Sequence, residues 1–117
     1  MATREACIEL LRAAGELRTL SESIRNYRGN ADGMRTRIDE ARSRAESTRL
    51  SAASVSMQAP ELAESAYQVA SAATDLIHDV QEGIDVNQGV PVGEWDVGRI
   101  VDCTRGFRDA AVKHTGG

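Results

Sequence analysis

Aromatic residues and proline are scarce in this sequence. Only 3% of its 117 residues are aromatic, and it has two Pro. A core without many rings has to be filled by Ala, Val, Leu and Ile, and the small side chains among these let helices approach closely. The scarcity of proline and the long runs of good helix formers predict an all-α fold.

Long apolar runs are missing as well. No stretch approaches the roughly 20 apolar residues that a membrane-spanning helix requires. The first turns carry Arg4, Glu5 and Glu9 and therefore do not resemble a signal peptide. We expect a chain without a membrane span that is made in the cytoplasm without a classical signal peptide. A place in a virion or an exported assembly is compatible with both expectations.

Residues for catalysis and metal binding are few, with two His and two Cys. No Gly-x-Ser-x-Gly motif or phosphate-binding loop occurs. Asp75, His78 and Glu82 lie on one helix surface and resemble one half of a di-iron site, but the second half is missing. Cys7 and Cys103 lie near opposite ends of the chain, where unpaired Cys usually act as small apolar residues. We therefore expect no enzymatic activity, no cofactor and no metal.

What the sequence has instead is a long heptad pattern. From Thr3 to Val55, small or apolar residues recur at alternating spacings of three and four, which indicates helices that bury one narrow seam. The positions are Thr3, Ala6, Leu10, Ala13, Leu17, Leu20, Ile24, Tyr27, Ala31, Met34, Ile38, Ala41, Ala45, Thr48, Ala52 and Val55. Similar seams follow at Leu62, Ala66, Val69, Ala73, Leu76 and Val80, and at Val97, Ile100, Thr104, Phe107 and Ala111.

The pattern predicts a single helical domain over residues 1–117, with coiled-coil-like, alanine-rich packing. Helices are expected at about 2–28, 33–57, 60–84 and 94–114, with a loop at 86–93. Gly29 and Gly33 indicate a break, with Asn30 or Asp32 as the cap of the second helix. These segments match an up-down-up-down four-helix bundle. The alternative is a long antiparallel hairpin that starts with one helix of about 55 residues, because the heptad phase passes through the glycines without a slip.

Charge is unevenly distributed along the chain. Residues 1–50 have ten Arg against eight acids (+2), residues 51–98 have eight acids and no base (−8), and residues 99–117 have four bases against two acids (+2). Such basic and acidic parts can attract each other within one chain or between subunits.

Arginines flank the seam of the second predicted helix at regular spacing. Arg28, Arg35, Arg42 and Arg49 recur seven residues apart, and others lie on the opposite flank. Acids occur four residues after three of these arginines, so intrahelical pairs should cancel much of the field. Aromatic residues for base stacking are missing, which makes nucleic acid an unlikely partner. The predicted protein-interaction residues are Arg28, Arg35, Arg37, Arg42, Arg44 and Arg49 with Ala41 and Ala45 of the seam.

These features predict a non-enzymatic structural or assembly protein that acts through helix–helix association. It would be a subunit or adaptor of a virion, tail, filament or secretion apparatus, with protein as its partner. The alternative is a small secreted or regulatory partner protein that works as a heterodimer. Length, helicity and alanine content are similar to those of small actinobacterial type VII secretion substrates, although Gly98 follows Trp95 by three residues and does not match their Trp-x-Gly turn.

Overall fold

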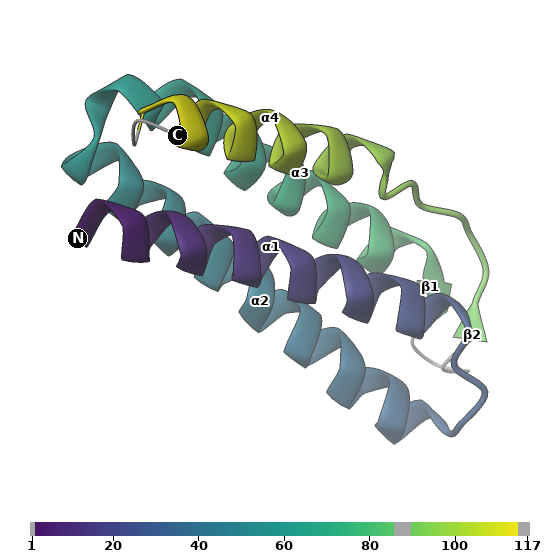
Figure 1. The fold of residues 1–117 in the computed structure, drawn as a ribbon. Helices are drawn as coiled ribbons and strands as arrows, with labels where there is room; N and C mark the ends of the chain where they lie inside the picture. Colours follow the sequence, from purple (N-terminus) through teal and green to yellow (C-terminus); the bar gives the residue numbers. More distant parts are fainter. Residues whose placement is uncertain (1, 86–89, 115–117) are drawn as a thin grey trace.

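The protein is an all-α bundle of four helices that alternate in direction. The computed structural model describes residues 2–85 and 90–114. The helices are α1 (Ala2–Arg25), α2 (Ala31–Gln58), α3 (Ala63–Glu82) and α4 (Gly98–His114), and a 3-10 turn at Pro60–Leu62 precedes α3. Both ends of the chain lie at the same end of the bundle (Figure 1), which measures 49 × 21 × 17 Å. The four-helix prediction is confirmed, and the long hairpin is excluded.

The break between α1 and α2 explains why one long helix does not form. The Asn30 side chain caps α2 by accepting a hydrogen bond from the Gly33 amide at 2.7 Å. The Tyr27 side chain turns back over this loop, and a Cβ at Gly29 or Gly33 would lie 2.0 or 1.9 Å from its hydroxyl oxygen. The helices end and begin a few residues earlier than expected, at Arg25 and Ala31. A larger residue at either position would require the Tyr27 ring to move.

The heptad seams form the core. All seam positions of α3 are buried, as are those of α1 and α2 except Thr3, Leu20, Tyr27 and Ala31, which are half-buried. On α4, Phe107 is fully buried and fills the largest share of the core. Because most of the other core side chains are Ala, Val, Leu or Ile, a single Phe and a single Trp supply the bulk that the small residues lack.

The link between α3 and α4 is longer than the predicted loop at 86–93, because residues 94–97 are not helical. Within this link, β1 (Ile84–Asp85) and β2 (Val90–Pro91) form a short antiparallel pair. Residues 86–89 of the expected loop 86–93 lie outside the described residues. Helix α4 begins at Gly98 and not at Glu94. The Asp96 carboxylate accepts a hydrogen bond from the Gly98 amide at 2.8 Å, a turn that sets the start of the helix.

Trp95 anchors this link to the bundle. Its side chain is only 5% exposed, and its indole N–H donates to the Ser21 carbonyl of α1 at 3.2 Å. The Arg25 guanidinium lies 5.3 Å from the ring centroid and also donates to the Trp95 carbonyl. A Cβ at Gly83 would lie 2.8 Å from the ring, so glycine at the end of α3 provides the space. One side chain thus ties the ends of α1 and α3 to the link.

Replacing Gly106 with alanine should stabilise the protein. Gly106 is an exposed residue inside α4, and a Cβ built there meets no atom within 4 Å. Alanine restricts the unfolded chain without a clash, so we expect the free energy of unfolding to rise by about 0.5–1 kcal/mol. Urea denaturation followed by circular dichroism measures the change. A loss of stability would mean that the end of α4 packs differently.

Candidate functional site

The predicted interaction residues divide into three groups in the structure. Ala41 and Ala45 are buried, at 0% and 7% exposure, within the chain's own core. Ala41 therefore has no exposed surface for a partner, and Ala45 reaches the surface only in the lining of a cavity between α2 and α3. The reason is that the seam of α2 is fully used by contacts within the bundle, chiefly with α1 and α3. The small alanines of this seam therefore let α2 pack closely against its neighbours within one chain.

Arg37 and Arg44 connect α2 to α1. The Arg37 guanidinium lies 4.7 Å from the centroid of the Tyr27 ring and donates to Ser23 Oγ at 3.1 Å. Arg44 forms an ion pair with Glu16 at 2.8 Å between the two helices. Arg28 donates to the Tyr27 carbonyl at 2.9 Å in the loop. These three arginines therefore have partners within the chain.

Arg35, Arg42 and Arg49 form a regular series with three acids on the exposed side of α2. Arg35 pairs with Asp32 at 3.0 Å, and Arg42 pairs with Asp39 at the same distance. The third pair, Arg49 with Glu46, has an Nε–Oε2 distance of 3.0 Å. We name these residues the acid–arginine stripe: Asp32, Arg35, Asp39, Arg42, Glu46 and Arg49.

The sequence correctly predicted intrahelical pairs but assigned them to the wrong acids. It paired each arginine with the acid four residues later, whereas the structure pairs it with the acid three residues earlier. Side chains on a helix point back toward its N-terminus, so a long arginine reaches the preceding turn more easily than the following one.

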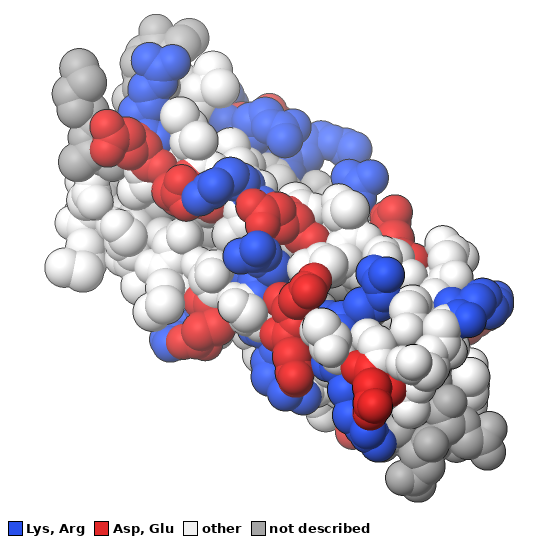
Figure 2. All heavy atoms as spheres, turned by 90° about the horizontal axis from the view of Figure 1, so that it is seen from below, with Lys and Arg blue, Asp and Glu red and all other residues white. Residues whose placement is uncertain are grey.

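The stripe is exposed and stays charged. Its side chains are between 54% and 91% exposed. The hydrogen bonds from Arg49 lower the pKa of Glu46, so this carboxylate remains ionised at a lower pH than a free Glu. Figure 2 views the bundle from below and shows acidic and basic side chains alternating over this face, without a large area of one sign.

A groove between α2 and α3 runs along the stripe. A cavity of about 590 Å³ has Asp39, Arg42, Glu46 and Arg49 on one wall and Thr74 and Ile77 on the other. It continues past Arg49 and Thr74 into a second cavity of about 360 Å³. Tyr67, which is 65% exposed, lines this second part. We call the two cavities together the α2–α3 groove. Its first cavity is the charged half, and its second is called the uncharged half because most of its lining residues are uncharged, with Arg49 and Asp75 as the exceptions.

Arg42 bridges the charged half of the groove. In the amide orientation that satisfies both groups, the Gln81 side-chain oxygen accepts from Arg42 Nε at 2.9 Å. Arg42 therefore contacts both an acid of its own helix and a side chain of α3. This holds the middle of the stripe in a defined position at the edge of the groove.

The residues considered for metal binding and nucleophilic chemistry are His78 with Glu82 and the two cysteines. His78 pairs with Glu82 at 3.9 Å on the surface, and both side chains are about two-thirds exposed or more. Among residues 2–85 and 90–114, no three His, Cys, Asp or Glu side chains are placed to hold a metal ion. Cys7 and Cys103 are both unpaired, as expected. Burial raises the pKa of the Cys7 thiol, which disfavours the reactive thiolate.

Comparisons with protein families, with curated proteins and with solved structures found no match for this chain. Within the described residues, none of the helices combines the length and the apolar character that a membrane crossing would require. The surfaces described above are therefore the basis for any functional assignment.

Proposed function

We propose that this chain is a non-enzymatic assembly protein whose α2 helix associates with α2 of a second copy. It would serve as a helical subunit or adaptor of a larger complex such as a virion, tail, filament or secretion apparatus. The observation that carries the proposal is the order of charges in the acid–arginine stripe.

The stripe is complementary to itself in one direction only. Acids and arginines alternate at spacings of three, four, three, four and three residues. Each position counted from one end of the stripe therefore has the opposite charge to the same position counted from the other end. An antiparallel alignment that sets Asp32 opposite Arg49 of the second copy also sets Arg35 opposite Glu46 and Asp39 opposite Arg42. In a parallel, in-register alignment every acid would face the same acid. Charge therefore favours a two-fold, antiparallel dimer.

The groove supplies the apolar contact that charges alone would not. An exposed ion pair contributes only about 0.2–1 kcal/mol, so the three pairs and their symmetry equivalents set orientation more than affinity. Tyr67 is 65% exposed in the uncharged half, where the small Ala53 and Ser56 also line the groove. Burial of these side chains by the second copy would supply affinity.

The association should depend on salt. We expect light scattering to give the mass of a dimer at low salt and a shift toward the monomer as salt increases, because exposed charges are screened over about 10 Å at 0.1 M. The double variant Arg35→Glu, Arg42→Glu should be monomeric at all salt concentrations with unchanged helix content. Its control, Arg4→Glu with Arg12→Glu, makes the same change in charge on exposed residues of α1 and should still dimerise.

A monomer at every salt concentration for the native chain would overturn self-association. The uncharged half of the groove, with exposed Tyr67, would then favour the second candidate, a small secreted or regulatory protein that binds a different helical partner there. Replacement of Tyr67 by alanine would weaken that heterodimer, whereas reversal of Arg35, which lies outside the groove lining, would not.

A further inference from the structure

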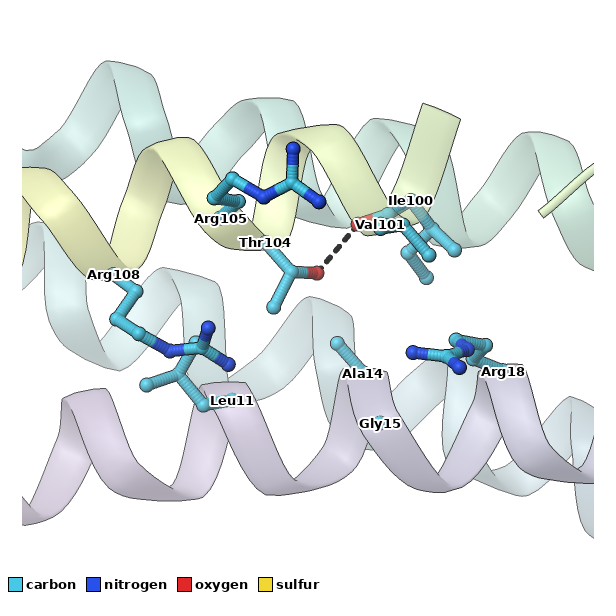
Figure 3. A pocket seen from close by; sticks show the side chains of 9 residues that line it. All are labelled: Leu11, Ala14, Gly15, Arg18, Ile100, Val101, Thr104, Arg105 and Arg108. Atoms are coloured by element: carbon cyan, nitrogen blue, oxygen red, sulfur yellow. Dashed lines mark hydrogen bonds between the residues drawn. The ribbon is translucent and has the colours of Figure 1, made fainter. Parts of the chain in front are cut away.

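A second charged surface lies on another side of the bundle, between α1 and α4. A cleft of about 230 Å³ is lined by Arg18 of α1 and by Arg105 and Arg108 of α4, and no acidic residue lines it. Figure 3 shows the Arg18 and Arg108 guanidinium groups pointing toward each other from opposite ends of the gap, with Gly15 and Thr104 between them. The floor is apolar, with Leu11 and Ile100 among its residues.

Two of the three arginines have an acidic partner, in each case at a long distance. Arg18 donates a hydrogen bond to Glu22 at 3.4 Å, and Arg105 forms an ion pair with Asp102 at 4.0 Å, which is too far for a hydrogen bond. Within the described part of the chain, Arg108 forms no side-chain hydrogen bond or ion pair. The three positive charges at this small cleft repel each other, whereas an anion bound between them would be attracted to all three.

The cleft also has open space beside the backbone of α1. A Cβ at Gly15 would meet no atom within 4 Å, so the middle of the cleft is open down to the surface of α1. At about 30 Å³ for each water, a volume of 230 Å³ corresponds to about eight waters. This space suits a phosphate group with a short organic residue.

We propose that this cleft binds the phosphate group of a small molecule, either a phosphate monoester or inorganic phosphate. A carboxylate presents two oxygens in one plane and matches a single guanidinium fork. A phosphate presents several oxygens in a tetrahedron and can accept from Arg18 on α1 and from Arg108 on α4 together. The site belongs to a different face from the α2–α3 groove, so it does not depend on self-association.

Titration calorimetry at low salt tests the site with inorganic phosphate, glycerol phosphate and acetate. We expect one saturable site for both phosphates and much weaker binding of acetate. Arg18→Gln and Arg108→Gln should each weaken phosphate binding at least tenfold. Arg12→Gln, whose arginine is exposed on α1 and paired with Glu9, should leave it unchanged. Tighter glycerol phosphate than phosphate would identify a monoester as the ligand, and equal affinity would identify the free anion.

A variant that fills the cleft provides an independent measurement. Gly15→Glu places a carboxylate in open space among the arginines and should abolish phosphate binding while the thermal unfolding transition is retained. The proposal is overturned if phosphate binding does not saturate, if acetate binds equally well, or if Arg12→Gln lowers affinity as much as Arg108→Gln does.

Discussion

Replacing Trp95 with alanine is expected to lower the free energy of unfolding by about 3–5 kcal/mol. The ring is buried in the contact between the link, α1 and α3, so its loss leaves a cavity that the small neighbouring side chains cannot fill. The Ser21 carbonyl would lose the indole N–H, and the Arg25 guanidinium would lose the face of the ring. Urea denaturation measures the change.

Tyr67→Ala is the matched control for this experiment. It also removes an aromatic ring, but from a side chain that is 65% exposed, and surface changes usually stay within about 0.5 kcal/mol. If Trp95→Ala cost less than about 1 kcal/mol, the link would not be an anchor and the placement of residues 94–97 would need revision.

Giving the acid–arginine stripe a single sign is expected to abolish self-association. In the acidic variant, Arg35, Arg42 and Arg49 are replaced by Glu, so each attractive contact of the antiparallel dimer becomes repulsive. If each of the six contacts changes by about 0.5–1 kcal/mol, the dimer weakens by more than about 100-fold. The basic variant, with Asp32, Asp39 and Glu46 replaced by Arg, should fail to dimerise for the same reason.

Helix content must be measured alongside, because both variants also lose the pairs within α2. These pairs contribute about 0.2–0.5 kcal/mol each, which is small beside the packing of the α2 seam. We therefore expect both variants to remain folded, and circular dichroism checks this.

The core was predictable from the sequence because its signal is local and periodic. Residues three and four apart share one face of a helix, so the positions from Leu10 to Val55 could be assigned to the core before any helix was placed. The sequence favoured a break at Gly29 and Gly33, since glycine and a capping Asn lie within five residues, but the unbroken heptad phase left one long helix open as the alternative.

Contacts between distant parts of the chain could not be predicted in this way. Trp95 and Ser21 are 74 residues apart, and nothing in the sequence near either of them indicates the hydrogen bond that joins them. The same is true of Arg18 and Arg108, which line one cleft only because α4 packs beside α1. The spacing of residues in the sequence could reveal neither arrangement, because it relates only residues within one helix.

The candidate surface was predicted in part. The seven-residue period of Arg35, Arg42 and Arg49 correctly indicated one exposed line on α2, but spacing alone did not separate these arginines from Arg37 and Arg44, which bind α1. That distinction requires the position of the neighbouring helix. The uncharged half of the groove, with Tyr67, was missed because its two walls come from different helices.

The most direct test of the central claim is the mass of an equimolar mixture of the acidic and basic stripe variants, measured by light scattering. We predict that each variant alone is monomeric and that the mixture forms a heterodimer, because opposite charges again face each other along α2. The control mixes the basic variant with a chain that carries Arg4→Glu, Arg12→Glu and Arg105→Glu, which has the same net charge as the acidic variant but an intact stripe. Because its intact stripe lets this chain form homodimers, native mass spectrometry is used to identify the chains in each dimer, and the basic variant should remain monomeric in the control. A mixture of the two stripe variants that stays monomeric, or a control in which the basic variant forms heterodimers equally well, would contradict pairing through the stripe.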